Sequence, residues 1–379
     1  MLFGQLNTWE NLVSAGHKAA LGKRDKASAV FFLFRQETEL LRLQHELSEK
    51  TWRPGGYRSF RIFDPKERLI SAAPFHDRVV HHALCNVIEP VFEKSFIYDS
   101  YANRKGKGTH QAILRFHEYA RRHPFVLKCD IRKFFPSLDH AILKQEIRRR
   151  IWCPDTLWLI DAIIDGSNPQ EPVLDYFPGD EIAPLSFGGG GGATRRRGLP
   201  IGNLTSQFWA NVYLNRFDHY VKETLRVPGY IRYVDDFVLF ADSKEQLHQW
   251  RSDIQNYLDG LRLLLHPDKT HIYRCADGVP FLGFRVFPYH RYVRKEKTRR
   301  YRRFLKQKIK HYRAGHITPD ELEQALNAWL GHIRFGQSRR LEYNIYRYLR
   351  DAGINVLKHP DGAWKVLEYR QIRRGIRPP

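Results

Sequence analysis

The stretch YVDDFVLF, residues 233–240, sets two aspartates, Asp235 and Asp236, inside a run of apolar side chains. With the residues YIR before it, the stretch forms two apolar runs separated by the two aspartates, which is the spacing of a tight β-hairpin. Polar residues are common in turns, so a purely structural turn explains the pair equally well when the stretch is taken alone. However, such a loop prefers Asn-Gly or Asp-Gly, and burying a carboxylate is costly unless it is paired or binds a metal. The stretch therefore predicts a hairpin whose carboxylates need positive charge nearby.

The composition is that of a strongly basic globular protein. The 379 residues include 63 Lys or Arg and 41 Asp or Glu, which gives a net charge of +22, and 42% of them are hydrophobic. A field of this sign favours nucleic acid or an anionic membrane as partner, while a protein that is merely basic is the alternative. The sequence has no apolar run of 18 residues, no signal-peptide pattern and no Cys-x-x-Cys pair. We therefore expect a cytoplasmic protein with no membrane partner, zinc ribbon or disulfide framework.

Composition and periodicity divide the chain into four segments. These are a helical extension at 1–50, a basic hairpin with helices at 51–128, the aspartate-bearing segment at 129–288, and basic helices with a tail at 289–379. Residues 165–198 look like a loop and contain five glycines at 188–192, which we interpret as a flexible connector. The sequence T-P-D-E at 318–321 predicts a capped helix start, and the shift to basic residues places a boundary near 287–291.

Asp130 is a third candidate acidic residue. It ends the short apolar strand predicted in VLKCD, where a carboxylate is by default an exposed capping group. Three carboxylates, from a strand end and a neighbouring hairpin, can nevertheless converge on divalent ions, and Mg²⁺ favours one or two carboxylates together with substrate phosphates. Two such ions, about 3.5–4 Å apart, can hold the attacking and leaving oxygens of a phosphoryl displacement. In a basic protein, this set of residues points to nucleotidyl transfer.

The order of these motifs resembles the palm of reverse transcriptases. The motifs are the strand ending at Asp130, GLPIGNLTSQ at 198–207, YVDD at 233–236, PDK at 267–269 and FLGF at 281–284. The resemblance extends back through the basic hairpin and the segment SYANRKGKGTHQA, which look like the fingers, and the basic helices after residue 289 fit a thumb. It covers roughly residues 55–290. The resemblance implies an α+β right-hand polymerase fold with fingers, palm and a helical thumb, and an RNA-directed DNA polymerase.

The resemblance also assigns roles to residues of the palm. Asp130 and Asp235 would hold two Mg²⁺ ions, for which Mn²⁺ can substitute, with help from the backbone carbonyl of Ile131 and from Asp236. Phe135 falls where the family places an aromatic ring against the sugar 2′ position, and a ring there would select deoxynucleotides. The alternative is that Phe135 is simply a core residue.

Basic residues complete the set that the resemblance implies. Lys269 matches a lysine near the triphosphate, where it is a candidate proton donor to pyrophosphate. The fingers candidates for binding the incoming triphosphate are Lys66, Arg68 and Arg78. The thumb candidates for contacting template and primer are Arg299, Arg300, Arg303, Lys306 and Lys310. For the fingers candidates, ordinary solvated charge on a surface hairpin is the alternative.

One motif departs from the usual family pattern and resembles a particular branch. The usual Q-G-x-x-x-S-P is here I-G-N-L-T-S-Q, with Ile201, Gly202 and Gln207 as nucleotide-binding candidates. This form resembles the reverse transcriptases of diversity-generating retroelements, where an aliphatic residue replaces the glutamine beside the nascent base pair. The branch implies a template RNA copied into cDNA with errors at adenines, and a small, basic, oligomeric accessory protein as partner. It also implies a prokaryotic or phage-encoded protein.

Three alternatives are kept open. One is another prokaryotic reverse transcriptase, of the group II intron-like, retron or abortive-infection type, without adenine mutagenesis. An RNA-dependent RNA polymerase is disfavoured by the bulk of Phe135. A non-catalytic nucleic-acid-binding scaffold is disfavoured because Asp130, Asp235 and Asp236 are all present.

Overall fold

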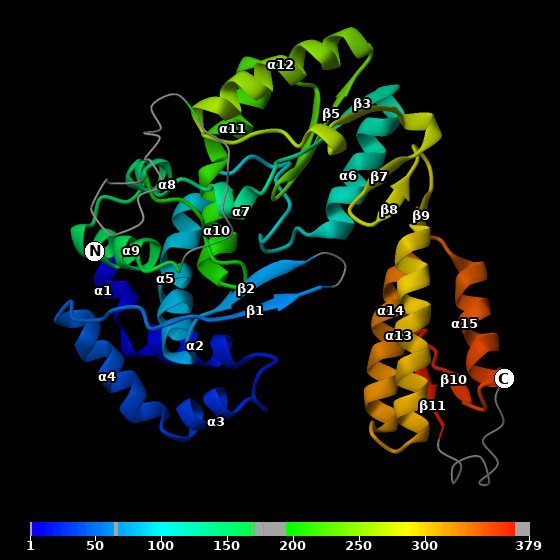
Figure 1. The fold of residues 1–379 in the computed structure, drawn as a ribbon, viewed down its shortest axis with the longest axis horizontal. Coiled ribbons are helices and arrows are strands. Elements are labelled where there is room, and N and C mark those ends of the chain that lie inside the picture. Colours follow the sequence, from blue (N-terminus) through cyan, green and yellow to red (C-terminus); the bar gives the residue numbers. More distant parts are fainter. Residues whose placement is uncertain (1, 64–66, 169, 171–176, 178–194, 368–379) are drawn as a thin grey trace, which may run out of the picture. The chain divides into compact units, whose positions relative to one another are not determined.

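The structure is a computed structural model that describes residues 2–63, 67–168, 170, 177 and 195–367 (Figure 1). The chain forms two compact units. Unit 1 comprises Met1–Gly108 and Leu127–Ile272, and unit 2 comprises Thr109–Val126 and Tyr273–Pro379. Helices alternate with small antiparallel sheets, so the predicted α+β class is confirmed. The boundary expected near 287–291 lies inside unit 2, because the short sheet that precedes it groups with the helices that follow.

Unit 1 begins with the helices predicted for residues 1–50. The helix α2 (Trp9–Ala20) is capped by Thr8, whose hydroxyl accepts a hydrogen bond from the amide of Asn11 at 3.3 Å. Its buried face consists of Leu12 and four small residues, and the helix packs on α5 (Phe75–Glu93). The helices of unit 1 are α1 (Leu2–Leu6), α2, α3 (Ala27–Phe34), α4 (Gln36–Ser48), α5, α7 (Phe134–Ser137), α8 (His140–Arg148), α9 (Pro154–Asp165), α10 (Leu204–Tyr213), α11 (Asn215–His219) and α12 (Lys244–Gly260).

The basic hairpin expected after residue 52 is present. It consists of β1 (Arg58–Ile62) and β2 (Arg68–Ala72), which pair antiparallel from Arg58↔Ala72 to Ile62↔Arg68. The strand β1 is exposed along its whole length, whereas β2 has a buried residue, Ser71. The predicted nucleotide-binding residue Lys66 lies outside the described residues.

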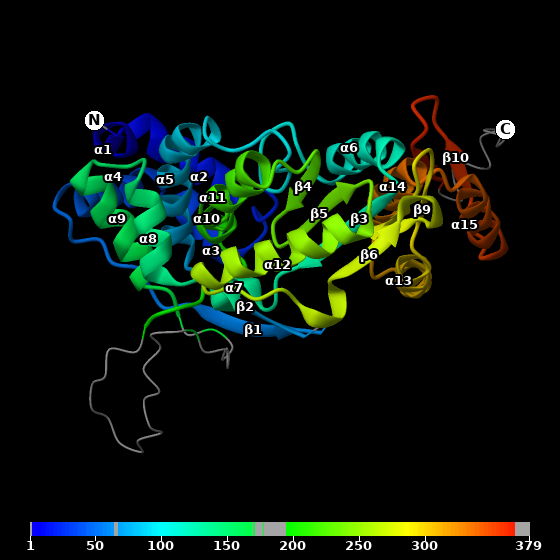
Figure 2. The same ribbon diagram turned by 90° about the horizontal axis from the view of Figure 1, so that it is seen from above.

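A four-stranded sheet in the order β4-β5-β3-β6 carries the predicted acidic residues. Its strands are β4 (Gly229–Tyr233), β5 (Asp236–Ala241), β3 (Phe125–Asp130) and β6 (His271–Arg274). Almost every residue of β4 and β5 is buried, and α12 packs on β5 (Figure 2). The buried strands therefore hold the acidic residues at their ends in fixed positions.

The predicted β4–β5 hairpin exists, but its register corrects the prediction by one residue. Tyr233 pairs with Asp236, so the two loop residues are Val234 and Asp235 rather than the two aspartates. Val234 has φ = 58°, in the left-handed region. A two-residue hairpin loop needs a residue with positive φ. Here that residue is β-branched, and β-branched residues are the most strained at positive φ. Local turn preferences alone do not predict this choice.

The segment after residue 203 forms three consecutive helical pieces. The helices α10 and α11 are followed by a π-helical turn, η1 (Tyr220–Thr224). A short 3-10 turn, η2 (Pro267–Lys269), precedes β6. The expected connector begins where α9 ends, but its glycine run at 188–192 lies outside the described residues.

Unit 2 contains the basic helices and two small sheets. Its sheets are β7 (Val279–Phe281), β8 (Phe284–Val286) and β9 (Arg291–Val293) in one, and β10 (Val356–Lys358) and β11 (Trp364–Val366) in the other. Its helices are α6 (Thr109–Arg122), the short 3-10 turn η3 (Cys275–Asp277), α13 (Lys295–Arg313), α14 (Pro319–Phe335) and α15 (Arg339–Asp351). The capping box predicted at 318–321 is confirmed, because Thr318 and Glu321 each accept a hydrogen bond from the other's backbone amide.

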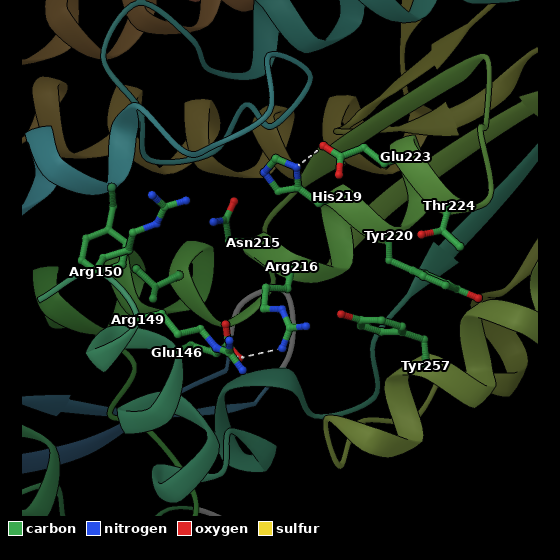
Figure 3. A pocket seen from close by; sticks show the side chains of 12 residues that line it. Glu146, Arg149, Arg150, Asn215, Arg216, His219, Tyr220, Glu223, Thr224 and Tyr257 are labelled. Atoms are coloured by element: carbon green, nitrogen blue, oxygen red, sulfur yellow. Dashed lines mark hydrogen bonds and ion pairs between the residues drawn. The ribbon is translucent and has the colours of Figure 1, made fainter.

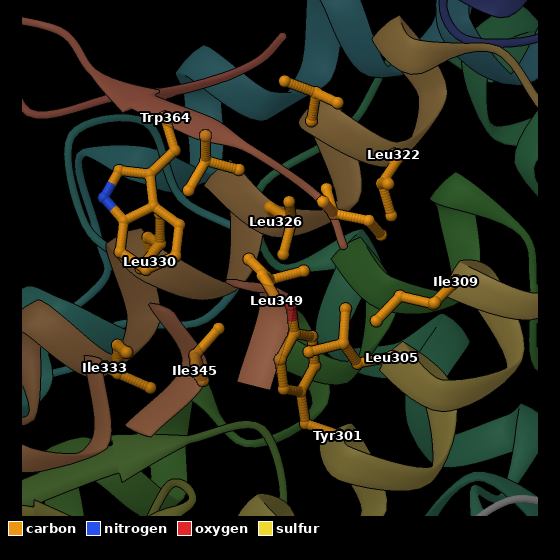
Figure 4. Packing of buried hydrophobic residues seen from close by; sticks show 13 residues of the cluster. Tyr301, Leu305, Ile309, Leu322, Leu326, Leu330, Ile333, Ile345, Leu349 and Trp364 are labelled. Carbon is orange, nitrogen blue, oxygen red and sulfur yellow. The ribbon is translucent and has the colours of Figure 1, made fainter. Parts of the chain in front are cut away.

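The apolar face of α13 contributes to the core of unit 2. Tyr301, Leu305 and Ile309 are buried against leucines and isoleucines of α14 and α15 (Figure 4). Phe304 lies one position away from this buried stripe and is 41% exposed. Among the described residues, no helix combines the length and the apolar character needed to cross a bilayer.

Candidate active site

A buried arginine fixes the turn between β4 and β5. Arg232 and Asp218 are both fully buried and form a bidentate ion pair, with Nη2–Oδ2 at 2.6 Å and Nε–Oδ1 at 2.7 Å. The remaining guanidinium nitrogen of Arg232 donates to the carbonyl of Val234 at 3.2 Å and to the side chain of Asn211 at 3.1 Å. Because the Val234 carbonyl immediately precedes Asp235, this network determines where that carboxylate stands.

The end of β3 lies beside this turn. The amide of Ile131 donates to the carbonyl of Asp235 at 3.3 Å, so Asp130 and Asp235 belong to neighbouring strand ends. On its other side, the carbonyl of Asp130 accepts from the amide of His266 at 2.7 Å, and Ile131 pairs with Leu265. The structure therefore brings Asp130, Ile131, Asp235 and Asp236 to one end of the sheet, as expected.

The carboxylates affect one another electrostatically. Burial raises the pKa of Asp235 to about 7, and the charges of Asp236 and Asp130 add to this effect. Burial also raises the pKa of Asp236, although Lys128 works against the rise through an ion pair at 3.3 Å. The Nζ of Lys269 hydrogen-bonds Oδ1 of Asp130. Lys269 thus faces Asp130 and Lys128 faces Asp236, while Asp235 is close to the negative charges of both carboxylates.

The donor set suits a hard divalent cation, but the described residues do not form a finished metal centre. Carboxylates and a backbone carbonyl are oxygen donors of the kind that Mg²⁺ prefers. A cation would also relieve the repulsion that raises the pKa of Asp235. Yet no three Asp, Glu, His or Cys side chains in the described part of the chain adopt the arrangement of a metal site. Asp130 and Asp236 point toward lysines instead.

Phe135 lies close to the acidic residues in sequence and is half-buried. Its ring packs edge-on against Phe134, with centroids 5.5 Å apart, and Phe134 itself is only 3% exposed. The carbonyl of Phe135 accepts a hydrogen bond from the amide of Leu199 at 2.9 Å. Phe134 is the core residue of the pair, and Phe135 is the one with a ring partly available to a ligand.

The motif at 201–207 is held against the basic hairpin. The carbonyl of Ile201 accepts from the amide of Ser71 at 3.0 Å. Gly202 has φ = 122°, and a Cβ there would lie 3.3 Å from both Ile70 Cγ2 and the Ser71 carbonyl, so only glycine fits without strain. Ile201 is half-buried, and Gln207 is exposed in the first turn of α10.

The predicted cationic residues differ in exposure. Arg68 is exposed on β2, whereas Arg78 is partly buried on α5, where its Nε donates to the carbonyl of Ala73 at 2.9 Å. Burial lowers the pKa of Arg78. The predicted nucleic-acid contacts on α13 are all exposed: Arg299, Arg300, Arg303, Lys306 and Lys310.

Sequence similarity identifies the family. The family model described as "Reverse transcriptase (RNA-dependent DNA polymerase)" matches residues 63–286. The chain belongs to the reverse transcriptase family. Its enzyme class is therefore RNA-directed DNA polymerase, and reverse transcriptase domains generally use divalent metal ions.

Individual relatives of this reverse transcriptase are distant. It is 27% identical over 294 residues to Protein YkfC of Escherichia coli, covering 66% of this chain and 72% of that protein. It is 21% identical over 271 residues to the Putative COX1/OXI3 intron 2 protein of Saccharomyces cerevisiae, covering 61% of this chain and 31% of the yeast protein. Among solved structures, apo telomerase of Candida tropicalis matches 63% of this chain and 55% of its own, with a TM-score of 0.45 and 13% identity.

Two positioning features of the reverse transcriptase site escaped the sequence prediction. Lys128 lies two residues before Asp130 on the same strand, so the two side chains share one face, which strand periodicity could have indicated. Arg232 sits in the middle of the apolar strand YIRY, and a charged residue there signals a buried partner. Its partner, Asp218, lies on α11 and has no local signal.

Proposed function

We propose that this reverse transcriptase is the error-prone polymerase of a diversity-generating retroelement, copying a template-repeat RNA into adenine-mutagenised cDNA. The observation that carries the proposal is Ile201, the aliphatic residue in place of the usual glutamine in I-G-N-L-T-S-Q. An amide can donate and accept hydrogen bonds beside template and nucleotide, whereas isoleucine offers only packing. Fewer polar constraints make a mispair less costly.

The backbone geometry supports a specific role for the Ile201 side chain. Its carbonyl is held by Ser71, and Gly202 packs closely on the same strand, so the path of the chain is constrained independently of the side chain. Exchanging the side chain should therefore change its chemistry and leave its position unchanged. Because the backbone position does not depend on the side chain, a substitution at position 201 tests the side-chain chemistry alone.

In the proposed mechanism, Asp130 and Asp235 would hold two Mg²⁺ ions, assisted by Asp236 and the Ile131 carbonyl. The ions supply charge neutralisation for in-line transfer of a nucleotide to the primer 3′ oxygen. Lys269 stands at Asp130, from where it can donate a proton to the departing pyrophosphate. Phe135 would select deoxynucleotides by excluding a 2′-hydroxyl.

The partners follow from charge and from the proposed branch. The exposed basic residues of α13 would contact the phosphates of template RNA and cDNA without reading sequence. Arg68 and Arg78, together with Lys66, are the proposed contacts of the incoming triphosphate. A small, basic, oligomeric accessory protein and a structured RNA that primes synthesis complete the proposed assembly.

The test compares Ile201→Gln with Ile201→Leu in cDNA synthesis on the cognate RNA, followed by deep sequencing. We expect Ile201→Gln to lower the error frequency opposite template adenines about tenfold, because the amide restores a polar constraint. Ile201→Leu keeps an aliphatic side chain and should keep the wild-type error pattern. If wild-type cDNA is faithful at adenines with cognate RNA and accessory protein present, the retroelement assignment is wrong and the polymerase assignment stands.

A second candidate is an intron-type reverse transcriptase. It is favoured by the similarity to the yeast intron 2 protein and, at 20% identity over 303 residues, to the Putative COX1/OXI3 intron 1 protein. This chain spans about a third of the length of those proteins. Faithful cDNA in the experiment above is the result that this candidate predicts.

A further inference from the structure

A cavity of about 510 Å³ lies in unit 1 between α8, α11, η1 and α12. Figure 3 shows that side chains from these separate elements point into one space. None of the candidate active-site residues that the structure describes lines it. Its volume falls in the range of roughly 300–1,000 Å³ that small-molecule sites occupy. The cavity is therefore large enough for a mononucleotide and separate from the polymerase chemistry.

One part of the cavity wall carries three arginines and two glutamates. Arg149, Arg150 and Arg216 line it, against the carboxylates of Glu146 and Glu223. Glu146 is only 7% exposed and pairs with Arg149 at 3.2 Å and with Arg216 at 3.6 Å, while both arginines remain about half exposed. The buried carboxylate thus fixes two guanidinium groups without covering them, and Arg150 is exposed beside them. This arrangement suits a phosphate, which arginines bind through charge-assisted hydrogen bonds.

A histidine also lines the cavity, and hydrogen bonds within the protein engage both of its ring nitrogens. His219 Nδ1 lies 2.5 Å from Glu223 Oε1, and its Nε2 lies 2.8 Å from the carbonyl of Ser95. With an acceptor at each ring nitrogen, the imidazolium form is favoured. Burial works to lower the pKa of His219, but these hydrogen bonds outweigh it, so the pKa lies above its ordinary value. Next to it, the buried Oδ1 of Asn215 has no hydrogen-bond partner among the described residues.

The opposite side of the cavity is aromatic. Tyr220 and Tyr257 stack on each other with centroids 4.3 Å apart and planes 21° apart. Tyr220 opens η1, and π-helical turns are rare and are found mostly at functional sites. Both rings are half-buried, so the stack offers a flat apolar surface at the edge of the arginine-bearing wall. A planar heterocycle can extend that stack.

We propose that this cavity binds a nucleotide, with its phosphate against Arg149, Arg150 and Arg216 and its base on the Tyr220–Tyr257 stack. A ligand with an anionic group and a planar aromatic group separated by a sugar matches the two kinds of surface in the cavity. The same chemistry is offered by a free mononucleotide and by one residue of an RNA strand that crosses the surface. The site is a second nucleotide site and does not depend on the retroelement assignment.

The test uses AMP and a uridine pentamer that contains 4-thiouridine. AMP affinity is measured by calorimetry on the full chain with a chelator present, which removes metal-dependent binding at the polymerase site. The pentamer is crosslinked by light, and the modified peptide is mapped by mass spectrometry. The variants are Arg150→Ala and Tyr257→Leu. The matched control is Arg148→Ala, the last residue of α8, which directly precedes Arg149 and Arg150 but pairs with Asp161 and does not line the cavity.

Each outcome bears on the proposal. AMP binding that weakens about tenfold in Arg150→Ala and Tyr257→Leu, and is unchanged in Arg148→Ala, supports the site with a free nucleotide as ligand. Absence of AMP binding, with the pentamer crosslinked to Tyr220 or Tyr257 and the crosslink lost in Arg150→Ala, supports the site with an RNA strand as ligand. Absence of both, or binding that none of these variants changes, overturns the proposal. Arg150 is exposed, so its variant should fold even if Tyr257→Leu does not.

Discussion

Two hairpins with two-residue loops differ in what their loops contain. In β7–β8, Phe281 pairs with Phe284 across Leu282 and Gly283, and both loop residues have positive φ, 45° and 91°. In β4–β5, Tyr233 pairs with Asp236, and the loop is Val234 and Asp235. The first loop has glycine where a hairpin of this length favours it. The second places a β-branched residue at φ = 58° next to a carboxylate with a raised pKa.

The difference shows where this protein concentrates strain and charge. The β7–β8 turn is stabilised by its own local sequence, whereas the β4–β5 turn depends on a buried ion pair with a helix elsewhere in unit 1. Strained backbone and like charges persist only where the surrounding structure over-determines them, and such places cluster at functional sites. The β4–β5 turn has both features, which supports the proposal that it is the centre of the polymerase site.

The largest expected loss of stability comes from removing Arg232, which holds the β4–β5 turn through its buried ion pair with Asp218. Arg232→Leu leaves the buried carboxylate of Asp218 without its partner, and breaking a buried pair in this way costs about 3–5 kcal/mol of unfolding free energy. Urea unfolding of the variant measures this cost. As a matched control, Arg148→Leu removes an arginine from an exposed pair with Asp161 and should cost less than about 1 kcal/mol. Equal costs for the two variants would show that Arg232 is not the anchor.

The two hairpins also show how far the sequence predicts this structure. The Thr318 helix start was predicted correctly, because a capping box is a local signal, and the glycine in the β7–β8 loop is a local signal of the same kind. The predicted register of β4–β5 was wrong by one residue. Turn preferences favour Asp-Asp over Val-Asp in the loop, and they take no account of the hydrogen bond from the buried Arg232 to the Val234 carbonyl.

The same limit applies to the candidate site. Family motifs indicated that Asp130 and Asp235 would lie together, and the structure places them at neighbouring strand ends. Which carboxylate each lysine contacts, Asp236 for Lys128 and Asp130 for Lys269, depends on tertiary geometry, which neither strand periodicity nor a short motif specifies.

The raised pKa of Asp235 predicts how stability changes with pH. In the folded protein this pKa is about 7, above its ordinary value of 3.8, so the folded state holds the proton more tightly than the unfolded state. The stabilisation is complete below the ordinary value and is lost as the pH rises through about 7. At about 1.4 kcal/mol per pKa unit, the loss between pH 5 and 8 should be on the order of 2–3 kcal/mol with a chelator present.

Unfolding free energies of the wild type and Asp235→Asn, measured at both pH values, isolate this contribution. The wild type should lose more stability than the variant as the pH rises, and adding Mg²⁺ at pH 8 should restore the wild type selectively. A difference between the two proteins that stays the same at pH 5 and pH 8 would contradict the assigned pKa.

The smallest expected effect is the relief of strain. Val234→Gly replaces a β-branched residue at positive φ by the residue that adopts it freely, at some cost in unfolded-state entropy, and should raise the unfolding free energy by about 0.5–1 kcal/mol. Leu282→Gly, at the equivalent first position of the β7–β8 loop, should gain less because leucine is not β-branched. Thermal unfolding of both variants ranks them. If Val234→Gly instead lowers the unfolding free energy, and lowers it more than Leu282→Gly does, the Val234 turn is not strained.

The most direct measurement is primer extension on an RNA template with Mg²⁺ and the four deoxynucleotides, comparing the wild type, Asp235→Asn and Asp242→Asn. Asp242 is exposed just beyond β5 and receives the same substitution outside the site. We predict cDNA from the wild type and from Asp242→Asn, and at least about a hundredfold less from Asp235→Asn, since metal-ion stabilisation of the transition state is worth several kcal/mol. Extension by Asp235→Asn at the wild-type rate would contradict the placement of the polymerase site at the β4–β5 turn.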